Sequence, residues 1–202
     1  MVKQIINGQR SMQKKSSARF NLTDSFLYFS EKNMEDFFYD SLIYICEHDE
    51  RGAFGLVINQ PLKLTTKKLF KSLHLNANSL VHDLDRVMQG GPVDVDKVFV
   101  LHGEQSASDS SSKLLENLYL STDAEILKRI TKQADTTFKV FLGYCGWGAN
   151  QLDEEFNEGV WEVIKTSQER IFDAKPSQLV DTISKELGYN LREISKGNNQ
   201  RH

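Results

Sequence analysis

The stretch GYCGWGANQLDEE, residues 143–155, carries the clearest structural pattern in the chain. It follows residues 137–142, which alternate towards a fully apolar end and therefore predict a buried central strand. Its glycines predict a tight loop, and Asn150 suits the cap of a helix over residues 150–158. The acids at 153–155 would complement the positive end of that helix. We therefore expect a strand, a glycine-rich loop and a helix in succession.

Three short runs rich in Phe, Tyr, Ile, Leu and Val precede this stretch, at residues 25–30, 41–47 and 53–58. Each is bounded by Asp, Asn, Gly or Pro, which is typical of strands. The polar linker 47–52 ends in glycine and predicts a hairpin between the second and third runs. Pro61 is expected to end the third strand, because proline cannot donate to a ladder.

Further strands and helices are predicted on both sides of the central stretch. The expected strands are 86–89, 97–101 and 118–121, with Gly90-Gly91-Pro92 as a turn between the first two. The expected helices are 65–73 behind a Thr cap, 123–133, and 177–187 with a Ser cap and Gly188 as its stop. Because strands and helices interleave without steady alternation, the pattern favours a single α+β domain with a mixed sheet.

The charge of the chain is unevenly distributed. Residues 1–19 hold five of the 25 Lys and Arg and none of the 28 Asp and Glu, so the rest has 20 positive and 28 negative groups, a net charge of −8. The basic segment 1–19 is predicted to be a mobile arm, with a targeting peptide or a start at Met12 as alternatives. Residues 193–202 read as a polar tail, and 20–192 as the domain. The acidic domain makes direct nucleic-acid binding the third of our hypotheses, since it would depend on the arm.

Several classes of protein are disfavoured by composition. No apolar run approaches the roughly 20 residues of a membrane span, and the N-terminus lacks the apolar core of a secretory signal, so we expect a cytoplasmic protein without membrane contact. Cys46 and Cys145 are too few for a disulfide scaffold and are expected to be free thiols. With His48 and His102 they could form a Cys₂His₂ set, but no short chelating pair is present, so neither a metal nor a cofactor is expected.

The loop at 143–155 has two readings. In the first it is a turn that packs Tyr144 and Trp147 against the core. In the second it lines a concave site with aromatic walls and with Gln151 and Glu154 as polar groups. A phosphate site is disfavoured, because a bound phosphate would meet the three acids of the first helical turn.

An enzyme remains the alternative hypothesis. Cys145 on a glycine turn, Cys46, or the carboxylate of Glu154 could serve a thiol- or carboxylate-dependent hydrolase, with His48 or His102 as the base. The competing reading is that the thiols are buried and inert, as free cysteines commonly are.

Four motifs in register resemble the AlgH/YqgE family over nearly all of residues 20–192. They are SLIYICEH (41–48), GAFGLVINQP (52–61), GGPV with FVLH (90–93, 99–102), and residues 142–155 with Trp161. The resemblance implies an α+β fold with a strongly curved, partly barrel-like mixed sheet flanked by helices, in a cytosolic bacterial protein or a plastid relative. It also implies the family's label of transcriptional regulator, which is linked to alginate production and rests on genetics. The family usually has Ala at the position of Cys145, which argues against a shared Cys145 mechanism.

The residues that match the family motifs supply the predicted site. We expect a regulatory or binding protein whose pocket, lined by residues 144–151 and the turn 90–92, holds a small molecule or a protein partner. The expected ligand-binding residues are Asn59, Gly90, Gly91, Pro92, His102, Gly143, Tyr144, Trp147, Gln151 and Glu154, with Cys46 and His48 as the alternative catalytic residues.

Overall fold

The computed structural model describes residues 21–31, 33–75, 85–103, 111–130, 137–173 and 175–194. The predicted basic arm 1–19 lies outside these residues. The serine-rich stretch 106–112 predicts an exposed loop, and its residues 106–110 also lie outside the described part.

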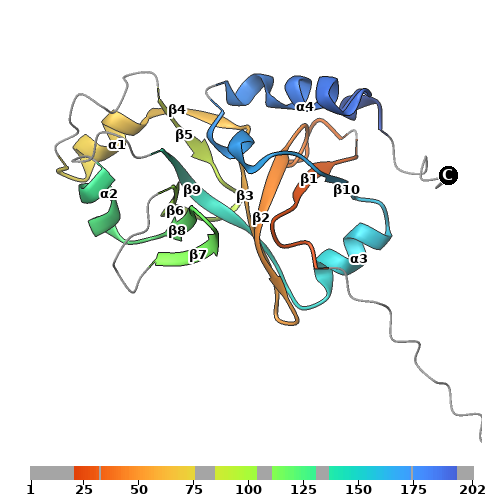
Figure 1. The fold of residues 1–202 in the computed structure, drawn as a ribbon, viewed down its shortest axis with the longest axis horizontal. Coiled ribbons are helices and arrows are strands. Elements are labelled where there is room, and N and C mark those ends of the chain that lie inside the picture. The colour runs from red at the N-terminus through yellow and green to blue at the C-terminus, as the bar shows by residue number, and fades with distance from the viewer. Residues whose placement is uncertain are drawn as a thin grey trace, which may run out of the picture.

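A strongly curved mixed sheet forms the body of the molecule (Figure 1), which confirms the predicted α+β fold. Nearly all neighbouring strands are antiparallel, but β5 lies parallel to β9. A short pair, β4 (Pro61–Thr65) and β5 (Arg86–Gln89), attaches to β9 beside the main path. Among the described residues the main path runs β10 (Trp161–Ile164), β1 (Phe26–Phe29), β2 (Leu42–Asp49), β3 (Gly52–Val57), β9 (Phe138–Trp147), β6 (Val93–His102), β8 (Leu118–Ser121) and β7 (Ser111–Leu115).

Strand β9 joins the two halves of the sheet. Its first half pairs with β6 and β5, and its last residues pair with β3. Phe141 and Tyr144 both face the inner hydrophobic cluster although they are three residues apart. The residue between them that breaks the alternation is Gly143, at a φ of +71°, a conformation that glycine adopts without steric cost. Beyond it Cys145 packs into a second cluster, on the outer side of β3.

Helices and 3₁₀ turns cover both faces of the sheet (Figure 1). Helix α4 (Leu179–Leu187), with η1 (Gln168–Phe172) and η3 (Leu191–Glu193), covers the inner cluster, and η2 (Pro176–Gln178) leads into α4. On the outer face, α1 (Thr66–Ser72) and α2 (Ala124–Ile130) cover the β6 half, and α3 (Gln151–Asn157) covers the β3 half. Both apolar faces of the curved sheet are thereby buried.

The prediction of a glycine loop at residues 143–147 is wrong. Residues 143–147 continue β9 as a strand, because they pair with β6 at Tyr144 and with β3 at 145–147. Ser111 and Ser112, the last residues of the predicted serine-rich loop, instead begin strand β7. Neither β7 nor β10 is predicted from the sequence. Pro61 follows a three-residue gap after β3 and opens β4, where a first strand residue does not need its N–H.

The helix ends were predicted with mixed success. The Thr65 hydroxyl caps α1 by accepting from the Lys68 N–H at 3.2 Å, and Gly188 ends α4 at a φ of +78°, as expected. Asn150 stands at the N-cap of α3, as predicted, but it is left-handed and its side chain makes no cap hydrogen bond. Ile194, two residues after the predicted domain end at 192, packs partly against the inner cluster.

Candidate functional site

Three predicted site glycines meet where β9 passes between the two halves of the sheet. A Cβ placed on Gly91 would lie 2.0 Å from the carbonyl carbon of Tyr144, and one on Gly143 would lie 2.5 Å from the Gly91 oxygen. A Cβ on Gly90 would lie 2.3 Å from the Gly143 oxygen. The backbones therefore touch, and only glycine fits at this crossing. Pro92, the next residue, is exposed.

An aromatic cluster made of Phe54, Phe99 and Tyr144 lies beside this crossing. The three rings come from β3, β6 and β9, and their centroids are 5.0 to 5.5 Å apart. Phe99 is buried, whereas Phe54 and Tyr144 are half-buried. The Lys97 ammonium lies over the Phe99 ring, 5.4 Å from its centroid. Phe54 is opposite Gly146 in the β3–β9 register, and the ring beside that glycine is that of Tyr144, whose Cε2 would lie 3.0 Å from a Cβ placed there.

Trp147 and Gln151 converge on Glu155. The indole N–H groups of Trp147 and Trp161 both donate to Glu155 Oε2, at 2.8 and 2.7 Å. Gln151 donates to Glu155 Oε1 at 2.8 Å, and its own oxygen accepts from the Gly148 N–H at 2.9 Å. Gln151 and Glu155 thus fasten α3 to the end of β9. Trp147 is only 7% exposed as a result.

Glu155, and not the predicted Glu154, is the carboxylate that binds at this position. Glu154 is exposed, whereas Glu155 is half-buried and accepts from both tryptophans of the chain. The i, i+4 spacing of Gln151 and Glu155 is the signal in the sequence that could have favoured Glu155.

Asn59 and His102 make internal hydrogen bonds at other positions. The Asn59 side chain accepts from the Leu42 N–H at 2.8 Å and donates to the Asp40 carbonyl at 2.7 Å, which holds the turn before β2. The His102 ring is fully buried, with Nε2 2.9 Å from the Ser121 hydroxyl. His102 pairs with Phe138 at the start of β9, and Tyr144 lies towards the other end, so the structure does not bring the two together.

The residues of the hydrolase alternative are also separated. Cys46 and Cys145 are buried, and burial raises the pKa of both thiols. Cys145 donates to the Gly90 carbonyl at 3.4 Å. The His48 ring accepts from the Leu22 N–H at Nδ1, and its Nε2 lies 3.8 Å from Asp153 Oδ1. In the described part of the chain, no hydrogen bond joins a thiol to an imidazole, and no cluster of three or more His, Cys, Asp or Glu could hold a metal ion.

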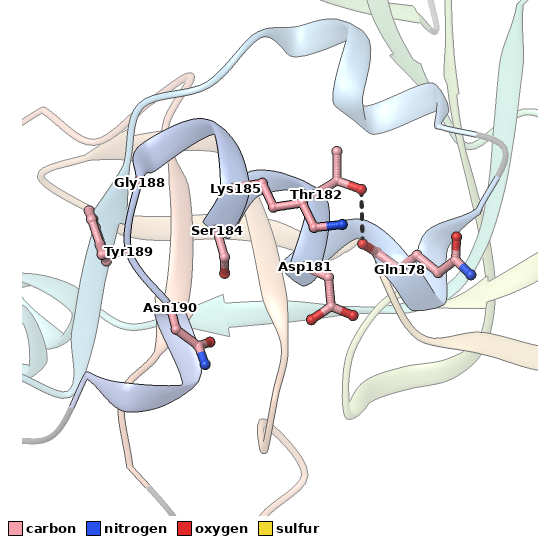
Figure 2. A pocket seen from close by; sticks show the side chains of 8 residues that line it. All are labelled: Gln178, Asp181, Thr182, Ser184, Lys185, Gly188, Tyr189 and Asn190. Carbon is pink, nitrogen blue, oxygen red and sulfur yellow. Dashed lines mark hydrogen bonds between the residues drawn. The ribbon is translucent and has the colours of Figure 1, made fainter.

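Two hollows lie around α4 and η3. A groove of about 760 Å³ runs along α4 and the turn after it (Figure 2), and Asp181, Lys185 and Tyr189 are among the residues that line it. A smaller pocket of about 260 Å³ is lined by residues of β1, the β1–β2 loop and η3, including Asp40 and Arg192. No sequence motif had pointed to either. Among the described residues, no helix is both long enough and apolar enough to cross a membrane.

Comparison with known proteins gives a consistent result. A family model described as AlgH-like matches residues 26–192. A UPF0301 protein from Shewanella denitrificans is 39% identical over 160 residues, which cover 79% of this chain and 87% of the relative. Another, from Shewanella sp. strain ANA-3, is 36% identical over 179 residues, which cover 87% and 96%.

A solved structure has the same fold. The solution structure of the AlgH protein from Pseudomonas aeruginosa superposes with a TM-score of 0.72 at 29% identity, over 88% of this chain and 94% of that protein.

Proposed function

The chain belongs to the AlgH-like family, and on that premise we propose that it is a regulatory binding protein of the bacterial cytosol. Its ligand, a small molecule or a segment of a partner protein, packs against the aromatic cluster Phe54–Phe99–Tyr144. The turn at Pro92 and the Lys97 ammonium flank this surface.

The observation that carries the proposal is the partial exposure of two stacked rings in the strands of the sheet. Phe54 and Tyr144 stack at 5.0 Å with an interplanar angle of 29°, yet both remain half-buried. Stacked aromatic surface with a few polar groups is the usual composition of a ligand site. The Tyr144 hydroxyl and the Lys97 ammonium are the polar groups here.

The position of the cluster supports binding in a second way. All three rings lie on paired strands. Beside them, the close backbone contacts of Gly90 and Gly91 with residues 143–144 hold β9 against the turn before β6. A site on rigid strands loses little conformational entropy when a ligand binds. Gly90, Gly91 and Gly143 contribute to the site by this close packing, and Trp147, Gln151 and Glu155 fix the adjoining end of β9.

The test is a thermal-shift screen with nucleotides, aromatic carboxylic acids and short peptides. We expect a ligand that stabilises the wild type by about 2.7 kcal/mol at a hundredfold excess over its dissociation constant. Tyr144→Leu and Lys97→Gln should each reduce that stabilisation, while Tyr189→Leu, at a tyrosine 45% exposed elsewhere, should keep it. The proposal is wrong if no compound stabilises the wild type, or if the effect is unchanged in both Tyr144→Leu and Lys97→Gln.

A further inference from the structure

His48 lies at the end of β2 and contacts the first described residues of the chain. Its side chain is only 5% exposed. The Nδ1 atom accepts from the Leu22 N–H at 3.1 Å, and the backbone N–H of His48 donates to the Thr23 hydroxyl at 2.9 Å. The Leu22 side chain packs in the cluster on the outer side of β3, together with Leu152 of α3. His48 therefore holds the N-terminal end of the described domain in place.

The hydrogen bond from Leu22 determines where the neutral imidazole carries its proton. A ring nitrogen that accepts an N–H donor has no proton of its own, so the proton is on Nε2. This Nε2 lies 3.8 Å from Asp153 Oδ1, which is too far for a hydrogen bond. Asp153 Oδ1 is buried and has no hydrogen-bond partner among the described residues. The neutral ring thus binds Leu22 and leaves a gap to Asp153.

The other ionisable groups on the elements around the ring have different partners or are exposed. Glu154, the residue after Asp153 on α3, is exposed, and Ala53, opposite His48 on β3, carries no charge. Burial raises the pKa of the Cys145 thiol in the same outer cluster, so this thiol is neutral. Further carboxylates are bound elsewhere: Asp24 by Tyr44 and Gln168, Glu47 and Asp49 by Arg51, and Glu155 by Trp147 and Trp161. Asp153 is therefore the carboxylate placed to bind a charged His48 ring.

We propose that His48 is a pH-sensitive switch that holds or releases the N-terminal segment 21–23. A histidine side chain changes its charge between about pH 5 and 8. Protonation occupies Nδ1, which can then no longer accept from the Leu22 N–H. The charged ring moves towards Asp153, and a charge-assisted hydrogen bond from Nε2 closes the 3.8 Å gap. The neutral ring binds Leu22, whereas the charged ring releases Leu22 and binds α3.

The release is local, because the next residues are held by bonds that do not involve the ring. The Asp24 N–H donates to the Ile45 carbonyl, and the Ile45 N–H donates to the Ser25 carbonyl, both at 2.9 Å. These bonds keep the start of β1 on β2 in both states of the switch. Residues 1–19, with five Lys and Arg and no Asp or Glu, precede the released segment in the sequence. The switch therefore acts where the basic part of the chain joins the acidic domain.

The experiment is an NMR titration of the full chain, labelled with ¹³C and ¹⁵N, from about pH 8 to about pH 5. It follows the ring carbons of His48 and the backbone amides of Leu22 and Asp24. We expect the Leu22 amide signal to shift with the same midpoint as the His48 ring, and its protection from hydrogen exchange to fall at least about tenfold. The Asp24 amide, which is bonded to Ile45, should change its protection less than about twofold.

Two variants and a matched control test the two contacts of the ring. His48→Asn keeps an acceptor near the position of Nδ1 but cannot be protonated, so the Leu22 amide should no longer respond to pH. Asp153→Asn removes the carboxylate that stabilises the charged ring, so the midpoint should move to lower pH. Glu154→Gln removes one charge from the next residue of α3, which is exposed, and should leave the midpoint unchanged.

Three results would overturn the proposal: a His48 ring that is still neutral at the end of the titration, a Leu22 amide that does not follow the ring, or a pH response of Leu22 that persists in His48→Asn. Equal movement of the midpoint in Asp153→Asn and Glu154→Gln would also contradict it, because the ring would then respond to the net charge of α3. None of these residues belongs to the aromatic cluster Phe54–Phe99–Tyr144, so a failed test would leave the proposed function standing.

Discussion

At the scale of single residues, the most constrained positions lie where β9 crosses the turn before β6. Backbone atoms of Gly91 and Tyr144 are so close that the glycine hydrogen already fills the space. At the end of β9, Glu155 accepts three side-chain hydrogen bonds from Trp147, Trp161 and Gln151. Substitutions at these points should destabilise the fold through identified contacts.

Gly91→Ala should lower the free energy of unfolding by more than about 3 kcal/mol, because its Cβ would overlap backbone that cannot move independently. Gly159→Ala is the matched control, since Gly159 has a φ of +75° but no atom within 4 Å of the added Cβ. The control should cost only about 1 kcal/mol, for the left-handed conformation. Urea unfolding followed by circular dichroism measures both, and equal losses would contradict the steric argument.

Glu155→Gln should cost about 1.5 to 3 kcal/mol, because an amide loses the charge that strengthens bonds to both indoles. Glu154→Gln, one residue earlier and exposed, should stay within about 0.5 kcal/mol of the wild type. Both tryptophans of the chain report on this carboxylate, so their fluorescence should change in Glu155→Gln alone. If Glu155→Gln left the free energy of unfolding unchanged, an amide would be able to replace the carboxylate at this position.

At the scale of elements, β9 connects most of the structure. It pairs with β3, β5 and β6, and its Lys139 reaches the segment after η1 by donating to the Asp173 carbonyl at 2.9 Å. Burial lowers the pKa of Lys139 from 10.5 to about 8. The bond therefore ties β9 to the C-terminal third of the chain, at the cost of a poorly solvated ammonium.

This cost predicts a specific pH dependence. Between about pH 8 and 10.5 the unfolded chain holds the Lys139 proton more tightly than the native state, so this group's contribution to stability rises with pH and is lost as pH falls towards 8. The stability of Lys139→Met relative to the wild type should therefore be greatest below pH 8 and should fall, by up to about 3 kcal/mol, as pH approaches 10.5.

Urea unfolding of both proteins across that pH range provides the measurement. Lys113→Met, at an exposed lysine of β7, is the control and should keep a constant difference from the wild type. If the free energies of unfolding of Lys139→Met and the wild type changed in parallel with pH, the Lys139 ammonium would be as well solvated in the native state as in the unfolded chain.

At the scale of the whole molecule, charge restricts the choice of partners. The net charge of −3 divides into −8 for residues 20–202 and +5 for residues 1–19. An extensive phosphate-binding surface needs clustered Lys and Arg. Direct binding to nucleic acid would therefore have to depend on the first 19 residues.

Removal of residues 1–19 should accordingly abolish any affinity for duplex DNA at physiological salt. For the full chain, five basic residues limit the slope of log K against log salt to about −4.5. Fluorescence anisotropy with a labelled duplex measures both quantities. If the shortened chain bound the duplex as tightly as the full chain, the DNA-binding surface would lie on the domain. That result would contradict the inference that the acidic domain does not bind DNA.

Much of the fold can be predicted from local sequence. The apolar runs of β1, β2, β3, β5 and β8 match their predicted ranges closely, and Thr65 and Gly188 mark helix ends as expected. These features depend on neighbours a few residues away. The family motifs were also recognisable, and the family model confirms them.

Other features depend on contacts between distant residues. The short strands β4, β7 and β10 lack a strong local signal, because their pairing partners decide their conformation. The candidate site is a similar case: a strand rich in glycine reads as a loop until Gly91 and β3 are placed beside it. The strand-forming segments, the α+β class and the family follow from local sequence patterns. The burial of the thiols and the Asp40–Arg192 pair could not be predicted, because they depend on side chains brought together from distant parts of the chain. The choice of Glu155 over Glu154 depends instead on how α3 folds back between the two nearby tryptophans.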